Sequence, residues 1–270
     1  MKKVGIIGCG NMGSILVESV VNVVGKNNTY CFDVDKEKSY KIKKVYKVKV
    51  LKSNFDLLNF VDVVLIAVKP QQIKDLLVEI RPYIKKEHLF ISIAAGVKIK
   101  TIEKILEKKV QIVRAMPNLP LKVSCGVTAV CKNKFCNTTN YNFAKEIFRY
   151  KGIVLEVKEK LMDAITAISG SGPAYIFYIS EILQNVAKDL NLPKRIIPNL
   201  VNYTILGAAK MLIQEKMPAF ELKNSVTSKG GTTEQALNIF YKHKIEDIFF
   251  KAIFSAYKRA EEFSKLVDKA

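Results

Sequence analysis

The chain contains 270 residues, of which 49% are hydrophobic and 26% are charged, and an excess of Lys and Arg gives it a formal net charge of +19. A chain of this length can bury a substantial core as one large domain or two ordinary ones, and its short apolar runs exclude a membrane-spanning helix, which needs roughly 18 to 20 apolar residues. The five cysteines show no C-x-x-C spacing and the two histidines have no nearby metal ligand, so we expect no disulfide framework, no metal site and no membrane partner.

The positive charge is spread along the chain instead of forming one patch. The densest run of lysines, over residues 36–44, contains a glutamate and apolar residues at helical spacing, which is typical of a solvated helix face. We therefore expect no nucleic-acid partner, although the excess charge favours a general attraction for small anionic substrates.

The N-terminal residues predict a strand that begins almost at once. Met1, Lys2 and Lys3 lead directly into the apolar run Val4–Ile7, which leaves no room for a removable signal sequence. We expect a cytoplasmic protein with reduced thiols.

The first part of the chain alternates short apolar runs with amphipathic segments. The runs are rich in β-branched residues and comprise Val4–Ile7, Tyr30–Phe32, Val61–Val68, Leu89–Ile93, Gln111–Ala115, Gly126–Val130 and Ile153–Val157. This pattern predicts an α/β fold, with an N-terminal Rossmann-type doubly wound sheet that is mostly parallel and carries helices on both faces, over residues 1–160.

Strand signals stop beyond that point. Apolar residues recur at helical spacing over residues 176–190, after Pro193 and over residues 245–267. We expect an all-α dimerisation domain over residues 161–270. Because its apolar stripes are too full for so small a domain to cover alone, we expect a homodimer.

A G-x-G-x-x-G sequence follows the first strand and precedes an apolar helix. Its residues are Gly8, Cys9, Gly10, Asn11, Met12 and Gly13. In this context Gly8 makes the tight turn, Gly10 admits a pyrophosphate to the backbone, and Gly13 lets the helix pack closely on the strand. The sequence therefore predicts a binding site for NAD(P)H.

Asp33 lies 20 residues after Gly13, at the end of the second predicted strand. A carboxylate there accepts hydrogen bonds from the adenosine ribose and repels a 2′-phosphate, which favours NADH over NADPH. Lys36 and Lys38 can attract that phosphate, so NADPH stays open. Alternatively, Asp33 or Asp35 only caps the following helix.

Two further strand ends carry residues suited to the same cofactor site, because strand ends face the cofactor in this fold. The candidates are Ala67, Val68, Lys69 and Pro70 at the end of the third predicted strand and directly after it, and Ala94, Ala95 and Gly96 after the fourth. A simple strand-to-helix turn explains the first group equally well. The small residues of the second group permit a close approach of a nicotinamide ring.

A loop near the C-terminus combines hydroxyls and glycines before a predicted helix. Its residues Ser228, Lys229, Gly230, Gly231, Thr232 and Thr233 can turn backbone N–H groups toward one point, where the helix start adds further donors. Such a loop can bind a carboxylate, with Thr233 facing the reacting atom. The alternative is a capped helix in which Thr232 and Gln235 form a capping box.

Six motifs, spread over nearly the whole chain, identify a family. They are Gly8–Gly13 (GCGNMG), Ala67–Pro70 (AVKP), Ala94–Gly96 (AAG), Arg114–Pro120 (RAMPNLP), Ser169–Tyr175 (SGSGPAY) and Ser228–Thr233 (SKGGTT). In this order they resemble delta-1-pyrroline-5-carboxylate reductase, the last enzyme of proline synthesis. The resemblance implies hydride transfer from NAD(P)H to the C=N bond of 1-pyrroline-5-carboxylate, giving L-proline.

The resemblance also implies the roles of individual residues. Thr233 hydrogen-bonds the ring nitrogen, and Ser228, Gly231 and Thr232 of the same loop hold the carboxylate. Asn54 contacts the adenosine ribose. The family's active site forms where the cofactor meets the helical domain of a partner subunit, and its members form dimers and often decamers.

Three residues depart from the family's pattern. Leu119 replaces a usual threonine, Lys229 replaces a frequent proline beside the two glycines, and Asp33 stands where NADPH-using members have a small hydroxylated residue. The third departure puts the usual phosphate-bearing cofactor in doubt.

Two other functions remain as alternatives. A β-hydroxyacid-type dehydrogenase shares the layout but needs a lysine base on the interdomain helix, and residues 169–187 contain no lysine. A basic nucleotide-sensing or nucleic-acid-binding protein can keep the Rossmann part as a scaffold. The intact loop of residues 228–233 argues against that function.

Overall fold

The computed structural model describes residues 1–269, with side chains described as far as Lys265. The chain divides into two compact units. The sheet unit comprises Met1–Ser171 and Ala256–Ala270, although Ala270 itself lies outside the described residues, and the helical unit comprises Gly172–Ser255. The sheet unit is therefore built from two separate stretches of the chain.

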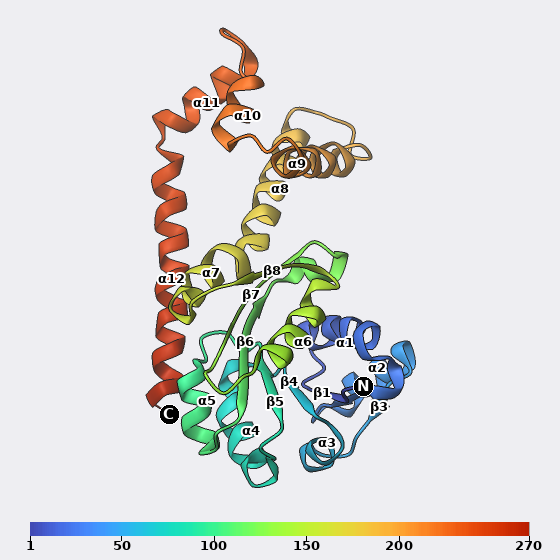
Figure 1. The fold of residues 1–270 in the computed structure, drawn as a ribbon. Coiled ribbons are helices and arrows are strands. Elements are labelled where there is room, and N and C mark those ends of the chain that lie inside the picture. Colours follow the sequence, from blue (N-terminus) through green and yellow to red (C-terminus); the bar gives the residue numbers. More distant parts are fainter. Residues whose placement is uncertain (270) are drawn as a thin grey trace. The chain divides into compact units, whose positions relative to one another are not determined.

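An eight-stranded sheet forms the centre of the sheet unit (Figure 1). Its strands are β1 (Val4–Ile7), β2 (Thr29–Phe32), β3 (Lys49–Val50), β4 (Val63–Ile66), β5 (Leu89–Ser92), β6 (Gln111–Pro117), β7 (Gly126–Lys132) and β8 (Gly152–Glu156). They lie in the order β3-β2-β1-β4-β5-β6-β7-β8, and every neighbouring pair is parallel except β6 and β7.

The helices of the sheet unit cover both faces of the sheet. They are α1 (Asn11–Val24), α2 (Lys36–Tyr46), α3 (Asn54–Phe60), α4 (Ile73–Ile80), α5 (Ile99–Leu106), α6 (Thr138–Arg149) and the short α7 (Met162–Ile165). Side chains of α1, α2 and α6 pack on one face, and those of α3, α4 and α5 pack on the other. The central strands β1, β4 and β5 are buried on both sides, which explains their continuous apolar runs.

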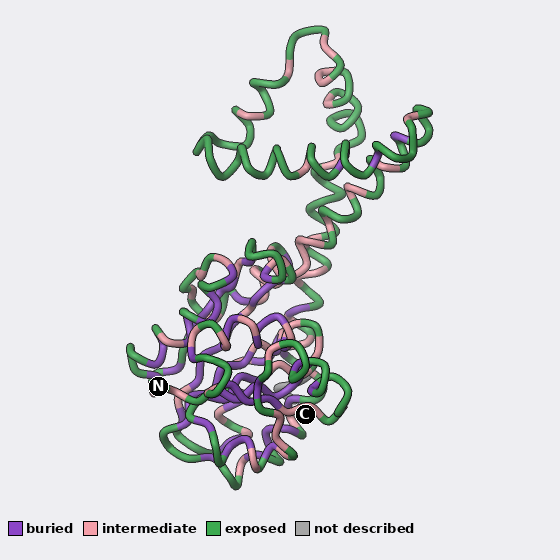
Figure 2. The backbone as a smooth tube through the Cα atoms, turned by 90° about the vertical axis from the view of Figure 1, so that its right-hand side faces the viewer, coloured by how far each residue is buried: buried purple, intermediate pink, exposed green. Residues whose placement is uncertain are grey.

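The helical unit consists of helices and their connections. Its helices are α8 (Gly172–Asp189), α9 (Ile197–Gln214), α10 (Ala219–Ser225), α11 (Thr232–Lys242) and the first part of α12 (Ile245–Lys269). One turn of π-helix, Thr166–Gly170, precedes α8 in the sheet unit. Figure 2 shows that buried backbone is concentrated in the sheet unit, whereas the tube of the helical unit is mostly exposed.

The predicted fold class is confirmed, and each of the seven predicted strands is present. The sequence did not predict β3, which has only two residues and no apolar run. The second predicted helix of the helical unit starts at Ile197, because the residues after Pro193 form a turn that Ile196 closes by donating its N–H to the Pro193 carbonyl.

Candidate functional site

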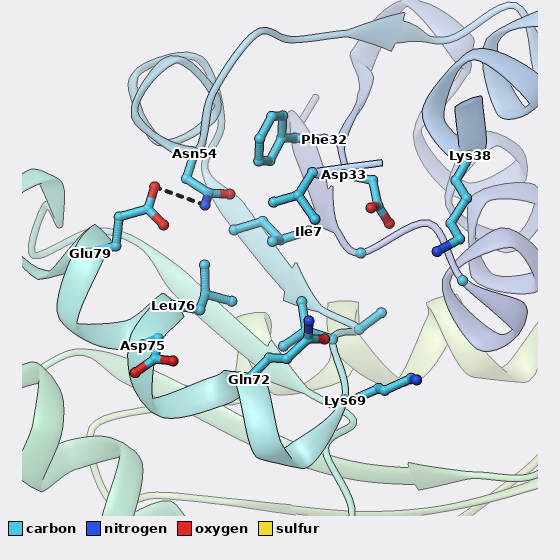
Figure 3. A pocket seen from close by; sticks show the side chains of 15 residues that line it. Ile7, Phe32, Asp33, Lys38, Asn54, Lys69, Gln72, Asp75, Leu76 and Glu79 are labelled. Carbon is cyan, nitrogen blue, oxygen red and sulfur yellow. Dashed lines mark hydrogen bonds between the residues drawn. The ribbon is translucent and has the colours of Figure 1, made fainter. Parts of the chain in front are cut away.

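A pocket of about 370 Å³ opens in the sheet unit beside the carboxyl ends of β1, β2 and β4. Its lining residues are Ile7, Gly8, Gly10, Phe32, Asp33, Val34, Lys38, Asn54, Ala67, Val68, Lys69, Gln72, Asp75, Leu76 and Glu79 (Figure 3). Strand ends of a doubly wound sheet meet at this edge, and a ligand binds where the order of the strands reverses. Here the reversal falls between β1 and β4, where the pocket lies.

The glycine-rich loop fits a pyrophosphate. Gly8 has a φ of +97°, and a side chain on Gly8 or Gly13 would meet backbone at 2.7 Å and 2.0 Å respectively, so both positions need glycine for the fold itself. Gly10 differs, because a Cβ there would meet no atom within 4 Å. The space next to Gly10 is therefore open to a ligand, and a dinucleotide site needs such space for the pyrophosphate to approach the backbone.

The other residues of the fingerprint lie outside the pocket lining. Cys9 is buried, and Asn11 and Met12 begin α1. Hydrogen bonding with the Cys31 thiol and burial raise the pKa of the Cys9 thiol above its ordinary value, so it stays neutral. A neutral thiol places no negative charge beneath a pyrophosphate.

Asp33 ties the end of β2 to the glycine-rich loop. Its Oδ2 accepts the backbone N–H of Cys9 at 2.6 Å, and its Oδ1 accepts that of Asp35 at 2.8 Å. The helix cap is a different residue: Asp35 is the N-cap of α2 and accepts from the Glu37 N–H at 3.0 Å. The structure therefore assigns the capping role to Asp35 and leaves Asp33 on the pocket wall.

The two predicted loops after β4 and β5 differ in their relation to the pocket. Ala67, Val68 and Lys69 line it, whereas Pro70 begins the following turn outside the lining. Ala94, Ala95 and Gly96 also lie outside the lining. Gly96 has a φ of +75°, and a Cβ there would lie 2.9 Å from the Cβ of Phe263 in α12, so this loop packs against the C-terminal helix.

Asn54 presents an unpaired acceptor at one end of the pocket. Its side chain is 4% exposed, its Nδ2 donates to Glu79 Oε1 at 3.0 Å, and its Oδ1 is buried with no hydrogen-bond partner among the described residues. A buried polar atom without a partner is rare in proteins. The atom marks a position for a ligand group that donates a hydrogen bond.

One side of the pocket is lined by residues that the sequence did not predict as site residues. Gln72, Asp75, Leu76 and Glu79 all come from α4 and the turn before it. Their spacing of three and four residues places them on one face of a helix. The sequence shows that these residues share one face of a helix. It does not show that this face lies next to Asn54.

The loop of residues 228–233 lies in the helical unit, and some of its backbone N–H groups already donate to nearby acceptors. Gly230 has a φ of +73°, its N–H donates to Glu234 Oε2 at 2.7 Å, and the N–H of Gly231 donates to the Ser228 carbonyl at 3.0 Å. The first-turn N–H groups of α11 follow at Thr232 and Thr233. The structure records no acceptor for these groups within residues 1–269.

The capping box proposed for Thr232 and Gln235 is wrong. Gly231 is the N-cap residue, Thr232 is the first helical residue, and no side chain caps the helix in the usual sense. Glu234 instead reaches back to the N–H of Gly230, before the cap. Both threonine hydroxyls are therefore left without a capping function.

The described residues form neither a membrane-spanning helix nor a cluster of metal ligands. No helix within residues 1–269 is long and apolar enough to cross a membrane, and no group of three or more metal-ligating side chains forms in that part of the chain. His88 is buried, its Nδ1 accepts from the Lys85 N–H at 3.1 Å, and burial lowers its pKa. It is a structural residue.

Known proteins resemble this chain over its whole length. A reductase named pyrroline-5-carboxylate reductase from Methanosarcina acetivorans is 34% identical over 98% of both chains. The chain belongs to the pyrroline-5-carboxylate reductase family. The family described as pyrroline-5-carboxylate reductase dimerisation matches residues 159–263, and that described as NADP oxidoreductase, coenzyme F420-dependent, matches residues 3–96.

Solved structures of pyrroline-5-carboxylate reductases have the same fold. The enzyme from Coxiella burnetii is 37% identical with a TM-score of 0.88, covering 97% of this chain and 98% of its own. The Plasmodium falciparum enzyme, solved with NADP bound, is 32% identical with the same TM-score and the same coverage. A homo-oligomeric reductase acting on a small molecule fits the matched dimerisation family, and the β-hydroxyacid-type alternative is not favoured.

Proposed function

We propose that this protein reduces 1-pyrroline-5-carboxylate to L-proline with NAD(P)H. The observation that carries the proposal is the pocket at the strand reversal, where Gly10 leaves open space and Asn54 Oδ1 lacks a partner, in a chain of this family. When bound, the reduced nicotinamide supplies the hydride.

In the sheet unit, the residues bind and orient the cofactor. Gly8 and Gly13 shape the glycine-rich loop, Gly10 admits the pyrophosphate to the backbone, and Asp33 and Asn54 accept from the adenosine ribose. The loops Ala67–Pro70 and Ala94–Gly96 lie at the neighbouring strand ends, where the rest of a dinucleotide would extend. Asp33 favours NADH because its carboxylate repels the 2′-phosphate of NADPH. Lys38 also lines the pocket and can attract that phosphate, so NADPH stays usable.

In the helical unit, residues 228–233 would hold the substrate. The first-turn N–H groups of α11 and the hydroxyls of Ser228 and Thr232 suit a carboxylate, because the start of a helix carries partial positive charge. The Thr233 hydroxyl positions the ring nitrogen. A basic imine nitrogen is protonated before reduction, so a hydroxyl is sufficient and no strong base is required.

The assembly follows from the same proposal. We place dimerisation and substrate binding in residues 161–270 and cofactor binding in residues 1–160, with a partner subunit's helical region completing each active site. Five such dimers would form a decamer. The odd number of cysteines suits the reducing cytoplasm.

The test is steady-state oxidation of NADH and of NADPH, each with 1-pyrroline-5-carboxylate, with proline as the measured product. We expect turnover with both cofactors and a higher kcat/KM with NADH. A β-hydroxyacid with oxidised cofactor serves as the control for the rival chemistry, and random-sequence DNA at physiological salt tests the binding-protein alternative. Failure to consume either cofactor with the imine would refute the proposal.

A further inference from the structure

We propose that Glu79 is a positioning residue that locks the Asn54 amide in one orientation, so that this end of the pocket selects a ribose hydroxyl. The inference rests on the proposed function, since it concerns the adenosine half of the cofactor. It assigns a role to a residue of α4 that the family motifs do not include.

The two side chains come from separate elements. Asn54 is the first residue of α3, directly after the N-cap Ser53, and Glu79 lies in the last turn of α4. Their side chains meet at the pocket, where Asn54 Nδ2 donates to Glu79 Oε1 at 3.0 Å (Figure 3). The amide oxygen points away from Glu79, toward the side of the pocket where Phe32 and Ile7 lie.

The chemistry of the pair fixes which amide atom faces the ligand. An ionised carboxylate accepts hydrogen bonds and donates none, so it can pair only with the NH₂ group of Asn54. The amide oxygen must then face the opposite way. Without Glu79, either end of the amide could face the pocket.

The locked orientation decides what can bind. A buried acceptor oxygen that has no partner among the described residues can gain a hydrogen bond from a ligand group that donates one. A ribose hydroxyl is a donor, whereas the oxygens of a phosphate dianion are acceptors. The Asn54 amide oxygen therefore favours an adenosine hydroxyl and disfavours a phosphate at the same position.

A neighbouring carboxylate provides a matched control. Asp75 lies one helical turn before Glu79 on α4, lines the same pocket and is exposed, as is Glu79, but no hydrogen bond joins it to Asn54. Removing either carboxylate makes the pocket less negative, which by itself should strengthen the binding of an anionic nucleotide. If removing Glu79 lowers the affinity for the nucleotide, the change has the opposite sign to the one expected from the loss of a negative charge.

The experiment measures binding of ADP to the full-length protein by titration calorimetry, with no imine substrate present. We expect Glu79→Ala to weaken ADP binding about five- to tenfold and Asp75→Ala to show no weakening. Glu79→Gln should weaken ADP binding by an intermediate amount, about two- to fivefold, because a glutamine amide carries a donor as well as an acceptor and fixes the Asn54 amide only in part. Thermal melts of the unliganded variants check that all are folded.

Two further measurements test whether Glu79 acts through Asn54 and whether the contact is to a ribose hydroxyl. In an Asn54→Ala background, Glu79→Ala should cause no additional loss, because Glu79 acts through Asn54. With 2′-deoxy-ADP and 3′-deoxy-ADP, the loss caused by Glu79→Ala should disappear for the analogue that lacks the contacted hydroxyl. Binding of reduced nicotinamide mononucleotide, which lacks adenosine, should be equal in all variants.

Several results would overturn the inference: unchanged ADP affinity in Glu79→Ala, equal losses in Asp75→Ala, or equal losses for ADP and both deoxy analogues. A wild-type protein that binds no ADP would overturn it too. A protein that shows the expected ADP pattern but fails to reduce the imine would leave the inference standing and refute the proposed function.

Discussion

The sheet unit and the helical unit bury their apolar side chains to very different extents. In the sheet unit, two large clusters on the two faces of the sheet enclose side chains such as Leu16 and Phe90 completely. In the helical unit, the buried hydrophobic cluster found among the described side chains consists of Ala187, Ile197 and Val201. Large side chains there stay open to solvent, including Tyr203 at 71% and Phe250 at 68% exposure.

This difference shows how the two units reach a stable state. The sheet unit completes its core within one chain, because helices cover both faces of its sheet. The helical unit exposes many large apolar side chains, and exposed apolar patches mark protein interfaces. The matched dimerisation family covers residues 159–263, which include this unit.

The largest expected effect tests the sheet unit as a binding site. Gly10→Val should leave the fold intact, because a Cβ there meets no protein atom within 4 Å, yet reduce cofactor affinity by about a hundredfold or more, because the side chain occupies the pyrophosphate's place. Fluorescence titration with NADH measures it. Gly13→Val is the contrast: its Cβ would lie 2.0 Å from the Gly8 carbonyl oxygen, so it should unfold the unit.

The next effect concerns a buried ion cluster in the sheet unit. The Arg114 side chain is 4% exposed and bonds Glu159 at 3.1 Å and Asp163 at 3.4 Å. Arg114→Ala leaves two carboxylates without their cation and should lower the free energy of unfolding by about 3 kcal/mol. Urea titration measures the change.

The exposed pair Arg81 and Glu107 provides the control for that variant. Its side chains are 39% and 68% exposed, so Arg81→Ala should cost less than about 1 kcal/mol. Equal losses for the two arginine variants would show that burial of the ion cluster adds nothing to the stability of the sheet unit.

In the helical unit, Thr233→Ala should lower kcat about ten- to a hundredfold through loss of the hydroxyl that positions the imine nitrogen. Stability should hardly change, because Gly231 is the N-cap and the Thr233 side chain caps nothing. Thr227→Ala, which removes a hydroxyl bonded to the Lys223 carbonyl, is the matched control. Unchanged kinetics would make Thr233 a structural residue.

The Thr233 variant also tests the shared active site. If a partner's helical region completes each site, co-expressing Gly10→Val and Thr233→Ala chains should restore about a quarter of wild-type activity, because half of the dimers are mixed and each has one intact site. No recovery would place both parts of the site in one chain.

Phe250→Glu tests whether the exposed apolar surface is an interface. Phe250 stacks on Phe254 with ring centroids 5.6 Å apart, and a charge there should weaken self-association about tenfold or more. Analytical ultracentrifugation measures it. Val45→Glu, at an equally exposed position on α2 of the sheet unit, should leave the oligomer unchanged. Dissociation by both variants would contradict the contrast between the units.

The smallest effect concerns cofactor choice. A phosphate dianion beside the Asp33 carboxylate costs on the order of 1 kcal/mol, so Asp33→Ser should raise the kcat/KM ratio of NADPH to NADH about tenfold. Asp35→Ser keeps the helix cap but frees Lys38, whose Nζ lies 3.2 Å from Asp35 Oδ2, so it should raise the ratio less than Asp33→Ser does. If the wild-type enzyme already prefers NADPH, Asp33 does not read the ribose.

The sequence predicted the parts of the fold whose signal is local. The strands β1, β4 and β5 were visible because a strand buried on both faces reads as an unbroken apolar run. The pairing of Asn54 with Glu79 was not visible, because it joins residues 25 positions apart through the packing of two helices. The cap of α11 was misplaced by one residue, because the preference for threonine at an N-cap does not reveal that glycine takes it.

The discontinuous sheet unit has a consequence for how the chain is made. Ala260, Phe263 and Ser264 of α12 belong to this unit, and Ser264 Oγ donates to Asp163. Synthesis proceeds from the N-terminus, so residues 172–255 are made between the two stretches of the sheet unit. The contacts of Ala260, Phe263 and Ser264 therefore complete the sheet unit only after the whole helical unit has been synthesised.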